Sequence, residues 1–272
     1  MRLFRLSMCF VIGCTLLSSC QKDLMRKESP DQTAASEPGK ANQALKFNTF
    51  YGPQVEVGEG HARTFSTISH TGVPQEIGVI LTDEALSGLP TQNIIYNLDF
   101  HHKAVEATLF EHVALGLSAR GHGLQPTGRI EAHFDFRFFM MTLEERLAIP
   151  APATTSTGAA GGGFDVLPQP GYLPSGYAWN FPVAQIGRHW SENTFTSGVH
   201  VEHTMIYGTW NGELTFINPI VTLETLASGT PVSVNYPQPE FVAKHGYYAT
   251  KYNIYEDGKG RHYVSLSGFV LR

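Results

Sequence analysis

The feature that most constrains the fold is an unbroken alternation of polar and apolar residues between His133 and Phe138. Successive side chains of a β-strand point to opposite faces of the sheet. The phenylalanines of this segment therefore share one face, which we expect to belong to the core, and His133, Asp135 and Arg137 share the other. A helix turns once every 3.6 residues and cannot place every second side chain on one face. The pattern therefore predicts a strand at Glu131–Met141.

Short apolar runs, separated by many of the 27 glycines and 16 prolines, extend this pattern over the chain. Asn211-Gly212 is the strongest hairpin signal, and a second hairpin joins Ala249–Tyr255 to His262–Leu271. Apolar residues make up 42% of the chain and charged residues only 16%, enough for a sizeable core. We predict a mainly β domain: an antiparallel β-sandwich or barrel-like fold with two or three short helices.

Two segments depart from the strand pattern. Thr142 followed by Glu145 forms a capping-box pattern, which predicts a short helix ending near Ile149, and Thr82 precedes a single helical turn. Residues 150–176 are rich in Pro, Thr, Ala and Gly, a composition that predicts a flexible loop. This loop divides residues 46–272 into two halves. Either each half supplies a sheet, or one domain straddles the loop.

Residues 1–20 predict a bacterial lipoprotein signal peptide. Arg2 and Arg5 precede a short apolar run from Leu6 to Leu17, and Leu17-Ser18-Ser19-Cys20 resembles a lipobox, whose cysteine receives the lipid. An ordinary signal peptide with a chance cysteine, or a membrane-spanning helix, is the alternative. The complete order of basic, apolar and lipobox segments favours lipidation at Cys20, which would anchor the protein to a membrane.

The segment that follows fits this location. Residues 21–45 are polar and lack aromatic side chains, as expected of a disordered tether. The segment resembles Gram-negative lipoproteins, and by that resemblance the absence of Asp at position 21, where Gln21 stands, favours the outer membrane of the bacterial envelope. The chain contains three cysteines, and Cys9 and Cys14 lie inside the export segment, so residues 46–272 contain no thiol and no disulfide.

The charge pattern argues against nucleic-acid binding. The formal net charge is −5, and lysines and arginines are scattered without a basic stripe. Proteins that bind nucleic acid gather such residues on one surface to neutralise phosphates.

The polar face of the alternating strand is the main candidate for chemistry. His133 and Asp135 stand about 7 Å apart at the backbone, close enough for their side chains to converge on one ion. Imidazole and carboxylate ligands suit a divalent transition metal such as zinc, iron, manganese or copper. The candidate ligands are His122, His133, Asp135 and His189, with His203 or Glu202 as substitutes. The alternative is a plain strand face on which Asp135 pairs with His133 and Arg137.

Other sites have weaker support. The sequence contains no Gly-x-Ser-x-Gly elbow and no phosphate-binding glycine loop. Four tyrosines near the end form a candidate sugar platform, with strand and edge packing as the favoured alternative: Tyr247, Tyr248, Tyr252 and Tyr255. We therefore rank a non-enzymatic binding or structural domain first, a metal-binding protein or metal-dependent enzyme second, and a carbohydrate-binding lipoprotein third.

The segment GHGLQPTGRIEAHFDFRFFMMTLEERLAI resembles a bacterial family of exported domains without an assigned function. The family pattern is a Gly-His turn, then His-Phe-Asp-Phe-His-Phe-Tyr, then a short acidic helix. The likeness spans most of residues 55–272 and includes IGVILTDEALSGLP, QIGRHW and IYGTWNGELTFINPIVTLETL. It implies a β-rich fold and homo-oligomers, but no activity.

Carried over to this chain, the family's polar positions are His122, His133, Asp135 and His189. Two positions depart from the family pattern. Arg137 stands where the family has His, and Asn218 stands before Pro219 where the family has Glu. If the family residues bind metal, this chain has lost two ligands.

Overall fold

The computed structural model describes residues 46–124, 128–154, 160–193 and 199–272, and residues 44–272 form one compact unit. The predicted signal peptide, Cys20 and the whole predicted tether lie outside the described residues. Within these described ranges, no helix has both the length and the apolar character needed to cross a bilayer.

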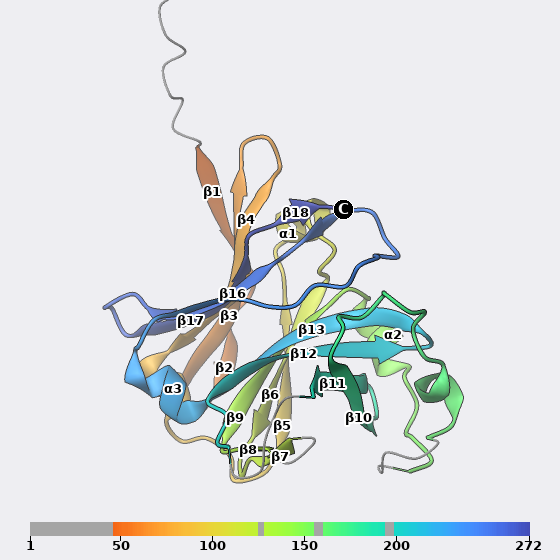
Figure 1. The fold of residues 1–272 in the computed structure, drawn as a ribbon. Helices are drawn as coiled ribbons and strands as arrows, with labels where there is room; N and C mark the ends of the chain where they lie inside the picture. The colour runs from red at the N-terminus through yellow and green to blue at the C-terminus, as the bar shows by residue number, and fades with distance from the viewer. Residues whose placement is uncertain (1–45, 125–127, 155–159, 194–198) are drawn as a thin grey trace, which may run out of the picture. The chain divides into compact units, whose positions relative to one another are not determined.

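Sheet A, the first of two seven-stranded antiparallel sheets, joins strands from the two ends of the described chain (Figure 1). Its strand order is β1-β3-β4-β17-β16-β14, with β2 paired to β3. The strands are β1 (Phe47–Tyr51), β2 (Val55–Val57), β3 (Gly60–Ser69), β4 (Pro74–Thr82), β14 (Val232–Asn235), β16 (Lys251–Glu256) and β17 (Arg261–Ser267).

Sheet B contains the alternating segment as its strand β9. The strand order is β10-β11-β12-β13-β9-β6-β5, again antiparallel throughout. The strands are β5 (Ile94–Asp99), β6 (His112–Ser118), β9 (His133–Phe139), β10 (Tyr177–Val183), β11 (Gly187–Glu192), β12 (His203–Trp210) and β13 (Glu213–Thr222).

Short elements complete the domain. Two pairs of strands form separate ladders: β7 (His122–Leu124) with β8 (Gly128–Ile130), and β15 (Tyr247–Tyr248) with β18 (Val270–Leu271). The helical segments are η1 (Asp83–Leu86), α1 (His102–Ala107), α2 (Leu143–Leu147), η2 (Gly162–Asp165) and α3 (Leu223–Ser228).

The main core lies between the two sheets. Phe134, Phe136 and Phe138 of β9 are fully buried and belong to one apolar cluster with Val79 of β4 and Val264 of β17. The phenylalanine face of the alternating strand is therefore a core face, and the sheets pack as a sandwich without closing into a barrel. The prediction of a mainly β, antiparallel domain with a few short helices is confirmed.

The hairpin and helix signals are also confirmed. Asn211-Gly212 joins β12 to β13, and Asp257–Gly260 joins β16 to β17. At the start of α2, the Thr142 side chain accepts from the Glu145 backbone, while the Glu145 side chain accepts from the Thr142 backbone. Thr82 precedes η1 but makes no side-chain cap.

The long loop does not separate the sheets, because each sheet takes strands from both sides of residues 150–176. Where the structure describes this segment, it holds η2 but no strand. Phe164 of η2 is buried in a small apolar cluster with Ile149 and packs edge-on against Trp210. Burial of this aromatic ring ties η2 to sheet B.

Candidate functional site

The candidate residues of β9 lie on the outer face of sheet B, away from sheet A. Alternation along the strand places His133, Asp135 and Arg137 on this face because the phenylalanines between them occupy the core. Both His133 and Asp135 are nonetheless buried, since β7, β10 and neighbouring side chains cover them. The polar face of β9 is thus a buried polar cluster.

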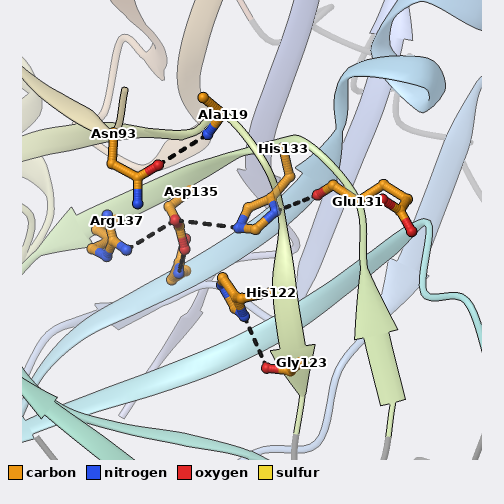
Figure 2. A network of polar contacts seen from close by, with 9 residues as sticks. Asn93, Ala119, His122, Gly123, Glu131, His133, Asp135 and Arg137 are labelled. Carbon is orange, nitrogen blue, oxygen red and sulfur yellow. Dashed lines mark hydrogen bonds and ion pairs between the residues drawn. The ribbon is translucent and has the colours of Figure 1, made fainter. Parts of the chain in front are cut away.

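Asp135 is the centre of this cluster. Its Oδ2 atom lies 2.9 Å from Nη2 of Arg137, and its Oδ1 atom accepts a 2.7 Å hydrogen bond from Nδ2 of Asn218. Nε2 of His133 is 3.6 Å from Oδ2. Figure 2 shows the chain of contacts that runs from Arg137 through Asp135 to His133. Both carboxylate oxygens therefore already have partners within the protein.

Two imidazoles are held by backbone carbonyls. Nδ1 of His133 donates to the carbonyl of Glu131 at 2.7 Å, and Nδ1 of His122 donates to the carbonyl of Gly123 at 2.9 Å (Figure 2). The two rings meet edge to face, with centroids 4.8 Å apart. These bonds place the proton of a neutral ring on Nδ1 and leave Nε2 with its lone pair.

His189 approaches the cluster from β11. Its ring hydrogen-bonds to the backbone of Phe181, and its Nδ1 atom is buried without a partner. Together with side chains from β7, β9 and β10, it lines a pocket of about 50 Å³, large enough for a few water molecules. The polar side chains that line this pocket are His122, Asp135, Arg137, Asn180 and His189.

The pocket combines one ion pair with neutral imidazoles at neutral pH. Burial lowers the pKa of His189 to about 3, with a further contribution from the nearby Arg137 charge. Burial also lowers the pKa of His122. Burial favours a higher pKa for Asp135, but the Arg137 charge and the hydrogen bond from Asn218 oppose it, and that pKa is held well below its usual range.

A glycine makes room for the guanidinium. Gly116 of β6 pairs directly with Asp135, and a Cβ atom at this position would lie only 2.4 Å from Nη1 of Arg137. Any larger residue would push the guanidinium away. Gly116 therefore supports the position of Arg137 against the carboxylate.

The structure brings the four predicted ligands, His122, His133, Asp135 and His189, to one cluster. Among the described residues, however, no three His, Cys, Asp or Glu side chains have the arrangement of a metal-binding group. The two alternative ligands, His203 and Glu202, do not reach this cluster. His203 points to the core face of sheet B and hydrogen-bonds to the Tyr252 hydroxyl at 2.8 Å, and Glu202 is exposed.

The predicted tyrosine platform does not form as a unit. Tyr248 and Tyr252 are buried, and Tyr252 faces the core while Tyr255, three residues later, faces outward. Neither Asn180, which lines the pocket, nor Gly116, which makes room for Arg137, was predicted as part of this site. A glycine inside the apolar run of β6 was the available signal, because such a glycine often marks a close approach of another group.

Comparison of the chain with protein-family models, with curated proteins and with solved structures gave no match.

Proposed function

We propose that this chain is a lipoprotein anchored to the bacterial outer membrane through Cys20. Its β domain is a non-enzymatic binding domain, and it binds a small polar ligand in the pocket beside Asp135. The order of basic, apolar and lipobox residues supports the anchor. The cluster around Asp135 supports the ligand pocket.

The observation that carries the ligand proposal is a set of unused hydrogen-bonding atoms. Nδ1 of His189, Oδ1 of Asn180 and Nε of Arg137 are buried without a partner, and all three residues line the pocket. Each unsatisfied buried group costs about 1–3 kcal/mol, so most buried polar atoms in proteins are paired. A small ligand that both donates and accepts hydrogen bonds would satisfy several of these atoms at once.

The ligand pocket is tested by titrating the chain with acetamide, urea and acetate while NMR follows its histidine ring signals. We expect at least one probe to shift the His189 signals saturably. Ile206→Phe, which fills the pocket wall, should abolish that shift, whereas Ile94→Phe on the exposed edge strand β5 should preserve it. Unchanged His189 signals with all three probes would contradict the proposal.

The lipid anchor is tested with Cys20→Ser and Cys14→Ser. Metabolic labelling with a radioactive fatty acid, followed by separation of membrane and soluble fractions, should show label and membrane association in the wild type and in Cys14→Ser. Both should be lost in Cys20→Ser. Label that persists in Cys20→Ser would place the lipid elsewhere.

Binding of a divalent transition metal is the second candidate. His133 and His122 each have one ring nitrogen bonded to a backbone carbonyl, as the ligands of metal sites usually do. The guanidinium of Arg137, however, occupies one oxygen of Asp135 and supplies the positive charge that a metal would bring. In our proposal Arg137 takes the place of the metal.

Metal binding is tested with the double variant Arg137→His and Asn218→Glu. These substitutions introduce the two residues that the family resembled by this sequence has at those positions. Calorimetry with zinc chloride should show one bound ion per chain in the double variant and none in the wild type. Stoichiometric zinc in wild-type protein that is lost in His133→Ala would instead favour the metal over the guanidinium. No heat from either protein would exclude the zinc site.

A further inference from the structure

The outer face of sheet A, on the opposite side of the sandwich from the Asp135 cluster, carries a separate open groove of about 570 Å³. It crosses strands β1, β3, β4, β17, β16 and β14. Its central polar lining consists of Thr67, Glu76, Ser233, Asn253, Tyr255 and Ser267.

The strand register explains why these side chains form a continuous row. Thr67 of β3 pairs with Glu76 of β4, and Glu76 pairs with Ser267 of β17. One step along, Asn253 of β16 pairs with Ser233 of β14. Directly paired residues share a face of the sheet, so small polar side chains line a path across it.

Hydrogen bonds between neighbouring strands hold this row in place. Ser233 donates to Oδ1 of Asn253 at 2.8 Å, and Nδ2 of Asn253 donates to Ser267 at 2.9 Å. Ser265 and Tyr255 donate to the same carboxylate oxygen of Glu76, at 2.5 and 3.0 Å. The network fixes the orientation of the side chains before any ligand arrives, which lowers the entropy cost of binding.

Aromatic rings lie along and at the end of the row. Tyr255 stacks on Tyr263, with centroids 4.7 Å apart and planes within 8°. Both rings are partly exposed, and Phe47 of β1, which also lines the groove, is 44% exposed. The groove therefore offers flat apolar surfaces beside hydroxyl and amide groups.

The charge of the lining restricts the kind of partner. Among the described residues that line the groove, Glu76 is the only one with a formal charge; the exposed Lys251, paired with Ser267 on the same face, is not part of the lining. The lining combines apolar surface from Phe47, Val232 and Tyr255 with the uncharged donors and acceptors of Thr67, Ser233, Asn253 and Ser267. Sugars match it, because they present many hydroxyls together with apolar ring faces that pack on aromatic rings.

We propose that this groove binds a neutral glycan, with Ser233, Asn253 and Glu76 contacting sugar hydroxyls and Tyr255 packing against a sugar ring. This role differs in site and ligand from the pocket around Asp135. Variants of the groove therefore leave the test of that pocket unaffected.

Affinity electrophoresis tests the proposal with the full chain, purified in a detergent without a sugar headgroup. The probes are a neutral panel of starch, β-1,3-glucan, xyloglucan, mannan and galactan, with alginate and heparin as anionic comparisons. We expect at least one neutral polymer to retard the protein. Asn253→Ala should weaken that binding about tenfold or more through its lost hydrogen bonds, and Ser233→Trp, on an exposed edge-strand position, should abolish it by filling the groove.

Gln54→Trp is the matched control, since it adds the same ring in an exposed loop and should bind like the wild type. Circular dichroism melts establish that each variant is folded. The proposal is overturned if no neutral polymer retards the protein, if Ser233→Trp binds like Gln54→Trp, or if only the anionic polymers bind.

Discussion

The guanidinium of Arg137 contacts Asp135 at 2.9 Å from a position two residues further along the same strand face. Both side chains are largely removed from solvent, with 11% of Arg137 and 7% of Asp135 exposed. Such a pair costs a large desolvation energy, which the mutual attraction offsets only while both partners are present. The pair therefore constrains the stability of the domain as well as the chemistry of the pocket.

Asp135→Asn should destabilise the domain strongly at neutral pH. The amide keeps the shape of the carboxylate but leaves the buried guanidinium without a counter-charge. Loss of one partner from a buried ion pair costs about 3–5 kcal/mol, which urea unfolding measures. Glu131→Gln is the control, because it removes a carboxylate from an exposed ion pair and should change the free energy of unfolding little. Equal effects in the two variants would contradict the central role of Asp135.

Gly116→Ala should destabilise the domain through Arg137. The new methyl group would overlap Nη1 of the guanidinium, and overpacking of this kind costs about 1–3 kcal/mol. Gly123→Ala is the matched control, since its Cβ would meet only the carbonyl of Gly128, at 3.8 Å. In an Arg137→Ala background the Gly116→Ala cost should fall, and a double-mutant cycle by thermal unfolding measures this coupling. If the effects of Gly116→Ala and Arg137→Ala on stability are additive, the new methyl group does not clash with Arg137.

The free energy of unfolding should fall as the pH drops from about 6.5 to about 4. Burial lowers the pKa of His189 to about 3 and that of His112 to about 4, whereas both rings titrate near 6.5 in the unfolded chain. Over this range the unfolded chain binds protons that the folded domain does not. Each histidine then contributes a slope of up to roughly 1.4 kcal/mol per pH unit, which urea unfolding at a series of pH values measures.

His112→Phe separates the two contributions to this slope. The His112 ring stacks on Phe139 with centroids 5.0 Å apart and nearly parallel planes, so a phenyl ring suits the position. The variant should keep most of its stability at pH 7.5 and show a smaller slope below pH 6.5. An unchanged slope would mean that His112 is not buried in its neutral form.

Arg146→Met should leave the domain as stable as before, or more stable. Arg146 is 2% exposed, and its Nε and Nη1 atoms are buried without a partner, while Nη2 donates to exposed Asn97. Burial and the Arg137 charge lower the pKa of Arg146 to about 10. Replacement of a poorly paired buried ion by an apolar side chain of similar size is often neutral or stabilising, by about 1–4 kcal/mol.

Arg146→Ala is the comparison for this prediction. It should lower the free energy of unfolding because it also removes the apolar stem of this buried side chain and leaves a cavity. Urea unfolding measures the free energy of unfolding of both variants. A loss of stability in Arg146→Met as large as that in Arg146→Ala would indicate that the guanidinium itself stabilises the fold.

The parts of the fold that the sequence predicted are those set by local chemistry. The alternation from His133 to Phe138, the Asn211-Gly212 turn and the Thr142 capping box each act within a few residues, and each has its expected structure. The pairing of β4 with β17 joins residues nearly two hundred positions apart, and no local pattern encodes it.

The same distinction applies to the candidate site. His133 and Asp135 were predictable as neighbours because two residues on one strand share a face. His203 was not excluded, because the face that it occupies depends on the register of β12 against β13. The room for the Arg137 guanidinium depends on Gly116, which reaches the site only through the pairing of β6 with β9.

The place of β9 within sheet B bears on how the pocket exchanges its contents. Strands β13 and β6 flank β9 on its two sides, whereas β10, which carries Asn180 and Phe181, is an edge strand. Backbone amides of a central strand exchange with deuterium mainly through global unfolding, and those of an edge strand exchange through cheaper local opening. We therefore expect β9 to stay paired while β10 opens locally, so that a ligand of the kind proposed for the pocket would leave past β10 while the rest of the sheet stays folded.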